Sequence, residues 1–165
     1  MDDSIRVLGN LEIIKKDENN NIVETRTVPN LVVAEGKKAI IQRMVHDFGD
    51  GNTTIQPFGG RFGRMAIGSN ADAVAASDTT LGKISTANSE VQSVSPLVNV
   101  ISDATVTYTV EFPGKGDGLT HNIREAAVFN SPTANTGNML CRTTFSTIEK
   151  GSTTSLTVNW NITVA

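Results

Sequence analysis

Residues 155–164 read Ser-Leu-Thr-Val-Asn-Trp-Asn-Ile-Thr-Val, and this stretch decides the fold class. Apolar side chains occupy every second position from Leu156 to Val164, and Thr or Asn occupies the positions between them. A period of two places the two sets on opposite faces of a β-strand, one buried and one in contact with water. The sequence therefore predicts a strand of an antiparallel sheet, with Trp160 as an anchor of the core.

Regularly spaced strands surround this stretch. Residues 104–112 alternate in the same way, with Ala, Val, Tyr, Val and Phe against Thr and Glu. Thr is β-branched and fits a pleated surface, whereas the Asn and Gly residues between the strands adopt turn conformations readily. Several short strands with turns between them are typical of an antiparallel β-sandwich or barrel. Further strands are predicted at residues 63–67, 94–101, 122–129 and 139–147.

The N-terminal part adds a hairpin and a helix. Residues 1–29 are predicted to form a hairpin with a turn at 18–21, and Pro29 ends its return strand because proline cannot donate a ladder hydrogen bond. A β-bulge is expected at Leu8–Gly9, where the alternation breaks. Residues 34–48 show the spacing of an amphipathic helix that packs on a sheet or a partner. Its apolar face is formed by Ile40, Ile41, Met44, Val45 and Phe48.

The chain is the size of one domain. Its 165 residues contain no repeat, charge block or linker, so we expect one β-rich domain over residues 1–165, with the main sheet over 63–165. The net charge of −3 is spread over both signs, which argues against nucleic-acid and membrane partners. No apolar run reaches the length of a membrane span and the first residues lack a secretory leader, so synthesis in a cytoplasm is expected.

Few residues suggest chemistry. His46 and His121 lie far apart in the sequence and are expected to be surface or capping residues. Cys141 has no second cysteine to pair with and is expected to be a small buried side chain. The acidic loop 47–52 resembles a calcium site but lacks its later glutamate, so a bound cation stays an open alternative. No catalytic set, cofactor or metal site is predicted, and the chain is expected not to be an enzyme but to act through contacts.

Five segments of the chain carry recurrent motifs. They are residues 30–38, 65–82, 124–130, 138–145 and 150–164, which read NLVVAEGKK, MAIGSNADAVAASDTTLG, REAAVFN, NMLCRTTF and KGSTTSLTVNWNITV. As a set they resemble a family of small virion structural proteins of tailed bacteriophages. The family's pieces are similar to ALGTG…AADTALG, a (T)EAGIFN strand and a final KG…LTITWTITV strand. Arg124 stands where Thr is expected and Ala127 where Gly is expected, departures that affect a turn or a contact rather than the fold.

The resemblance implies a structural function. Members of the family are thought to be capsid decoration, head-fibre or tail components. On this basis the chain is expected to be a capsid decoration (cement) protein of the virion that binds the major capsid protein or other virion proteins. It is also expected to form a homo-oligomer, namely a trimer. A tail, baseplate, neck or fibre-attachment component is one alternative, and a carbohydrate- or receptor-binding module is another.

Residues 69–80 are the first candidate for an assembly contact. They include few bulky side chains, so they gain little by folding back on their own domain, and small residues permit close approach of a neighbouring subunit. The alternative is a loop ordered on its own domain. The second candidate is the loop 56–62, whose aromatic residues suit a partner's pocket. The predicted contact residues are Phe58, Phe62, Ser69, Asn70, Asp72, Ser77, Asp78 and Thr79.

Overall fold

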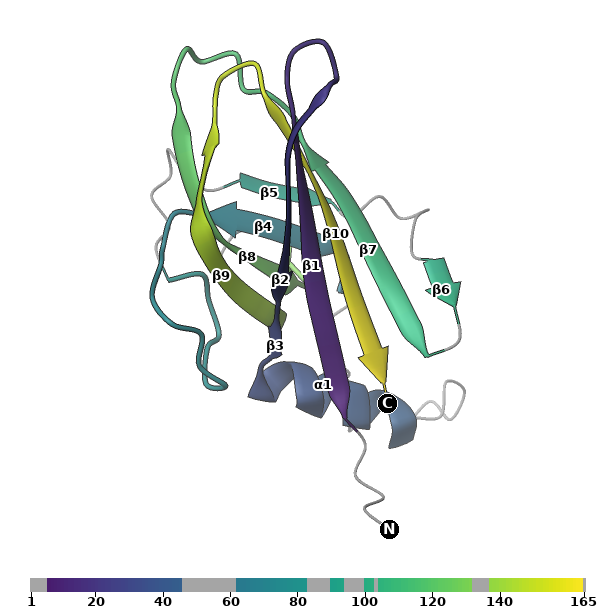
Figure 1. Ribbon diagram of the computed structural model, residues 1–165. Coiled ribbons are helices and arrows are strands. Elements are labelled where there is room, and N and C mark those ends of the chain that lie inside the picture. Colours follow the sequence, from purple (N-terminus) through teal and green to yellow (C-terminus); the bar gives the residue numbers. More distant parts are fainter. Residues whose placement is uncertain are drawn as a thin grey trace.

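Figure 1 shows a computed structural model of the chain, in which two antiparallel sheets of five strands each face each other and one helix lies across one end. The predicted fold class, a β-sandwich with one helix, is confirmed. No helix in the described parts of the chain is long and apolar enough to cross a membrane. The structure describes residues 6–45, 62–82, 90–93, 100–102, 104–131 and 137–164.

The strands divide between two sheets. Sheet A consists, in spatial order, of β2 (Ile22–Pro29), β1 (Val7–Lys16), β10 (Ser155–Val164), β7 (Thr105–Phe112) and β6 (Val100–Ser102). Sheet B consists of β3 (Leu31–Val32), β9 (Met139–Lys150), β8 (His121–Phe129), β4 (Arg64–Gly68) and β5 (Glu90–Ser93). The described strands of residues 63–165 therefore contribute to both sheets instead of forming one main sheet.

β10 lies at the centre of sheet A and shows the predicted alternation. Its buried side chains, from Leu156 to Ile162, face sheet B and are between 0% and 5% exposed. Trp160 is fully buried, so the predicted core anchor is confirmed. Cys141 is also fully buried, as expected, and this burial raises the pKa of its thiol. The core between the sheets thus depends on the period-two pattern that the sequence displays.

The N-terminal hairpin is an integral part of sheet A. β1 pairs with β10 along its whole length, from Val7 to Lys16. The bulge expected at Leu8–Gly9 is wrong, because this register is unbroken and the irregularity lies beside Lys16, in the pairing with β2. Gly9 breaks the hydrophobic alternation for a different reason. A Cβ atom at this position would collide with the Asn30 side chain.

The helix α1 (Ala34–Val45) confirms the helical prediction over residues 34–45, whereas residues 46–48 lie outside the described parts. Gly36 allows α1 to approach β9, because a Cβ atom there would collide with the Leu140 carbonyl oxygen. Ile40 packs against the core between the sheets. α1 therefore lies against one end of the sandwich (Figure 1).

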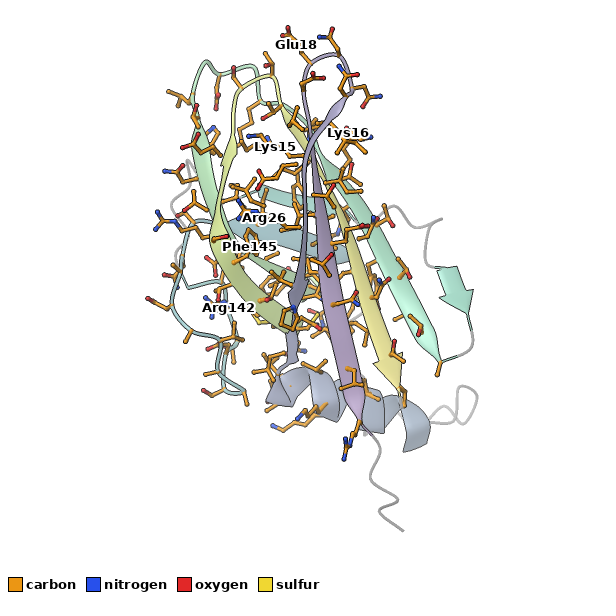
Figure 2. The ribbon with its side chains drawn as sticks, viewed as in Figure 1. Lys15, Lys16, Glu18, Arg26, Arg142 and Phe145 are labelled. Carbon is orange, nitrogen blue, oxygen red and sulfur yellow. The ribbon has the colours of Figure 1, made fainter. Side chains whose placement is uncertain are left out.

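Arg26 links the edges of the two sheets. It lies on β2, an edge strand of sheet A, and its guanidinium donates hydrogen bonds to the carbonyl oxygens of Ser146 and Thr147 on β9 (Figure 2). Unpaired carbonyl oxygens on a strand edge are a template for pairing with another chain. The Arg26 contacts occupy these acceptors and so protect this part of the β9 edge.

Candidate functional site

Residues 69–82, which we call the covering segment, lie on the outer face of sheet B. The segment begins where β4 ends and passes α1, where the Ala34 amide donates a hydrogen bond to the Ala76 carbonyl oxygen at 2.8 Å. Leu81 is 2% exposed and belongs to a small apolar cluster distinct from the core between the sheets. Sheet B is therefore buried on both faces around this cluster, whereas Asn122 on β8 and Glu149 on β9 are exposed. The other members of this cluster are Val33, Ala66, Ala127, Phe129 and Met139.

Glu125 on β8 fixes both ends of the covering segment. Its side chain is fully buried and accepts hydrogen bonds from the Asn70 amide at 3.2 Å and the Gly82 amide at 3.0 Å. Gly68 provides the space for this carboxylate, because a Cβ atom there would lie 2.6 Å from Glu125 Oε1. One buried side chain thus determines where the segment leaves the sheet and where it returns.

Arg142 on β9 neutralises this carboxylate. Its Nε and Nη2 atoms lie 3.0 Å and 2.9 Å from Glu125 Oε2, and its Nη1 atom lies 2.8 Å from Asp78 Oδ2. Figure 2 shows Arg142 on β9, the strand from which its side chain reaches the segment. Buried charges are tolerated when they are paired and hydrogen-bonded. We call Glu125, Arg142 and Asp78 the buried charge cluster.

The predicted contact residues divide into internal and exposed ones. Asn70 is 7% exposed and Asp78 pairs with Arg142, so both are engaged within the chain. Phe62 is half-buried and packs against the core between the sheets, and Phe58 lies outside the described residues. Asp72 is exposed, but its carboxylate accepts a hydrogen bond from the Asn70 side-chain amide at 3.1 Å. The remaining members are the half-buried Ser69 and the exposed Ser77 and Thr79. The segment is therefore ordered on its own domain, and its exposed surface alone is available to a neighbour.

The sequence analysis did not single out Glu125 or Arg142. Both lie in strands, where a charged residue is normally expected on a solvated face. A signal was present in residues 126–129, an unbroken run of Ala, Ala, Val and Phe directly after Glu125. Such a run is typical of a strand that is buried on both faces, which requires a cover on the outer face.

His121 was expected to be a surface or capping residue, and the surface alternative is wrong because its side chain is buried. It is 2% exposed at the start of β8, and its Nε2 atom lies 2.8 Å from Asp117 Oδ2. Lys150, opposite it on β9, is fully buried and donates a hydrogen bond to the Pro113 carbonyl oxygen at 2.6 Å. The connection between β7 and β8 folds over both side chains. The described residues include no group of three His, Cys, Asp or Glu placed to hold a metal ion, and the loop 47–52 lies outside them.

The outer face of sheet A carries rows of polar side chains. Asn161 on β10 accepts a hydrogen bond from Thr107 on β7 at 2.7 Å and donates one to Asn10 on β1 at 3.0 Å. A neighbouring row consists of Thr109, Asn159 and Glu12, joined at 3.0 Å and 2.8 Å. Cross-strand pairs of this kind stabilise a solvated sheet face and fix its side chains.

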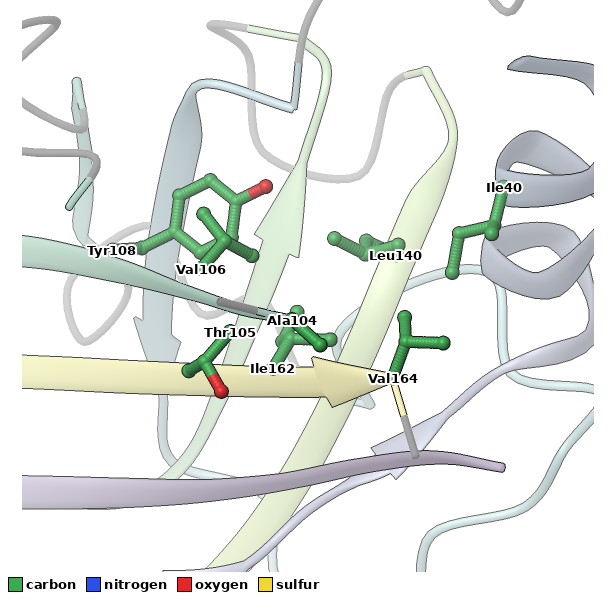
Figure 3. Close-up of a pocket in the computed structure, with 8 residues that line it drawn as sticks. All are labelled: Ile40, Ala104, Thr105, Val106, Tyr108, Leu140, Ile162 and Val164. Carbon is green, nitrogen blue, oxygen red and sulfur yellow. The ribbon is translucent and has the colours of Figure 1, made fainter. Parts of the chain in front are cut away.

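An apolar pocket of about 300 Å³ lies between α1 and the ends of β7, β9 and β10 (Figure 3). Its volume is at the lower end of the range for ligand pockets. The lining residues that the structure describes include no charged side chain, so the pocket is suited to an aliphatic group rather than to an ion. The residues that line it are Ile40, Ala104, Thr105, Val106, Tyr108, Leu140, Ile162 and Val164.

The chain was compared with known protein families, curated proteins and solved structures, and none of them matches it. The covering segment and the apolar pocket both include exposed residues, so a partner can reach them.

Proposed function

We propose that the chain is a structural protein of a tailed-bacteriophage virion that binds the outside of the major capsid lattice and stabilises it. The proposal is supported by the five motif segments and by their positions in the fold. Residues 124–130, 138–145 and 65–82 each supply one member of the buried charge cluster, and residues 30–38 contact the covering segment through the Ala34 amide. Motifs that are far apart in sequence thus form one packed unit.

This convergence is the observation that supports the resemblance most strongly. Each motif is short, and a single match would have little weight. Four of the five motif segments meet around Glu125 and Arg142. Together they hold the covering segment over sheet B. We infer that the motifs mark a shared fold, and that the exposed part of the covering segment contacts neighbouring virion proteins.

The proposed role is mechanical rather than enzymatic. Exposed residues of the covering segment, namely Asp72, Ser77 and Thr79, would touch a neighbouring subunit. The proposed partner is the major capsid protein or another virion protein, and the proposed assembly is a homotrimer. A symmetric oligomer on a repetitive lattice makes several weak contacts at once, so avidity compensates for a small area per copy.

The test is the abundance and position of the protein in purified virions. We expect quantitative mass spectrometry to find it in proportion to the major capsid protein, and cryo-electron microscopy to place it on the outside of the head. A few copies confined to the tail, baseplate or neck would favour the alternative virion role. Absence from mature particles would contradict both.

A charge substitution on the covering segment locates the contact. Ser77→Lys places a cation on its exposed surface, so binding to particles that lack the protein should weaken while the thermal stability of the free protein is retained. Glu149→Lys, an exposed change on β9, is the matched control and should bind normally. Equal binding by the Ser77→Lys variant would exclude this surface as the contact.

A further inference from the structure

We propose that copies of this chain contact each other head to tail, with the end of the β1–β2 hairpin of one copy seated in the apolar pocket beside α1 of the next. This inference rests on the proposed homo-oligomer and names the contact that builds it. The virion role is tested on particles and the contact on purified protein, so either can fail alone.

The hairpin end presents apolar side chains on a rigid turn. Ile22 and Val23 begin β2 directly after the turn, and they are 62% and 54% exposed. The turn is fixed by Asp17, whose carboxylate accepts hydrogen bonds from the amides of Asn19 and Asn21 at 2.9 Å and 2.8 Å. A preorganised segment loses little conformational entropy on binding. Exposed apolar side chains on such a turn are suited to docking.

The apolar pocket provides the complementary surface. Figure 3 shows Ile40, Leu140 and Val164 around its α1 side, with Tyr108 further along β7. Val164 is 42% exposed and Ala104 is also exposed, so the lining reaches the molecular surface. A volume of about 300 Å³ suits one or two aliphatic side chains. Such side chains enter without leaving a charge or a polar group unpaired.

The hairpin and the pocket lie at opposite ends of the sandwich. Val7, the first residue of β1, pairs with Val164 at the pocket, whereas the turn follows Lys16, the last residue of β1. A strand of this length separates the two ends by about 30 Å. The hairpin therefore cannot reach the pocket of its own copy, and a second copy must supply it. A contact between two different surfaces is heterologous and closes into a ring, such as a trimer, or continues as a filament.

The charges around the two surfaces are complementary. The residues of the turn, 17–21, contain two carboxylates and no cation, a net charge of −2, whereas Glu24 beyond the turn is paired with Arg26. α1 contains three cations and one carboxylate, a net charge of +2. Opposite net charges favour the approach of one copy's hairpin to the next copy's helix and disfavour the approach of two hairpins.

Two variants test the contact by the mass of the purified protein in sedimentation velocity. Ile22→Thr/Val23→Thr removes the apolar end, and Ala104→Trp fills the pocket from an exposed position. We expect each to be monomeric while the native chain forms a larger species. Their equimolar mixture should form a dimer and nothing larger, because one intact hairpin and one intact pocket remain. Leu119→Thr, which removes an apolar side chain that is 57% exposed in the connection between β7 and β8, should assemble normally.

Several results of this experiment would overturn the proposal. These are a monomeric native chain, native assembly by either variant, a mixture that stays monomeric, or loss of assembly by the Leu119→Thr control. The mixture is the decisive measurement, since only a heterologous contact lets two defective chains complement each other.

Disulfide cross-linking tests the same contact without blocking it. One chain carries Val23→Cys, the other carries Ala104→Cys, and diamide oxidises the two thiols to an intermolecular disulfide. The native Cys141 is fully buried and does not compete. We expect a dimer on a non-reducing gel that reduction removes. Replacing Val23→Cys by Glu111→Cys, an exposed position on sheet A, should give no dimer, and equal cross-linking from both positions would contradict the proposal.

Discussion

Part of the outer face of sheet B is covered by residues 69–82 of its own chain, whereas the outer face of sheet A is covered by no described segment of the chain. On sheet B the cover brings Glu125 and Arg142 out of water, so each charge must find its partners inside the protein. On sheet A the polar side chains of Asn159 and Asn161 are half-buried and are joined in rows across neighbouring strands. The two faces belong to one sandwich but differ in what keeps them intact.

The difference shows how the stability of each face is distributed over its residues. The covered face depends on single residues, because one buried carboxylate accepts hydrogen bonds from both ends of the covering segment. The open face depends on many weak pairs, each of which water can replace at small cost. Substitutions on the covered face should therefore affect the stability of the whole protein, and equivalent substitutions on the open face should have small effects.

The largest effect is expected from Glu125→Gln. The change preserves the shape of the side chain but removes its charge, so among the described residues the buried Arg142 retains only Asp78 as an ionic partner. Loss of one partner of a buried pair costs about 3–5 kcal/mol, and we expect the free energy of unfolding in urea to fall by an amount near the lower limit. Glu149→Gln, an exposed change on β9, should stay within about 0.5 kcal/mol of the native value. A similar free energy of unfolding for both variants would show that the covered face does not depend on the buried charge of Glu125.

A second substitution tests whether the covered face depends on close approach. Gly to Ala in a strand normally stabilises a protein by about 0.5–1 kcal/mol. At Gly68 the added Cβ atom would lie 2.6 Å from Glu125 Oε1, and several donors hold that carboxylate in place. We therefore expect Gly68→Ala to destabilise by about 1–3 kcal/mol in the same urea titration. A stabilised variant would show that the carboxylate moves freely and that the cover is loosely held.

The sequence predicts the open face better than the covered one. The alternation of residues 155–164 is a local pattern, and both the buried row and the polar row follow from it. The position of the covering segment follows instead from contacts between distant residues. Asn70 meets Glu125, which lies 55 positions away, and Asp78 meets Arg142, which lies 64 positions away. Periodicity carries no information about such pairs.

The expected docking segment also shows why composition alone was insufficient. Few bulky side chains indicated that residues 69–80 gain little by packing on their own domain. The structure holds them by other means, namely backbone amides bound to Glu125, the Asp78 carboxylate bound to Arg142 and one larger side chain, Leu81. Small residues suit this arrangement because the backbone lies against the sheet.

A smaller effect is expected on the open face from Asn159→Ala. The change removes the hydrogen bonds of Asn159 to Thr109 and Glu12 on neighbouring strands. A solvated hydrogen bond contributes about 1 kcal/mol or less, so we expect a loss of about 1 kcal/mol in the free energy of unfolding. Thr157→Ala leaves this row intact and serves as the control. A loss as large as that of Glu125→Gln would mean that the open face is as dependent on single residues as the covered one.

The smallest effect concerns pH and the hairpin turn of sheet A. The side-chain and backbone hydrogen bonds from Asn21, together with the Asn19 amide, hold the pKa of Asp17 below its ordinary value of 3.8. A carboxyl group whose pKa is lower in the folded protein stabilises it above the ordinary pKa, and this contribution is lost as the pH falls through the folded pKa. Asp17→Asn has no charge to titrate, so the stability difference between native and variant protein should shrink between about pH 5 and pH 2. As the pH falls, NMR signals of the turn should weaken at a higher pH than those of β8 and β9. A stability difference between native and variant protein that does not change with pH would exclude Asp17 as the group responsible.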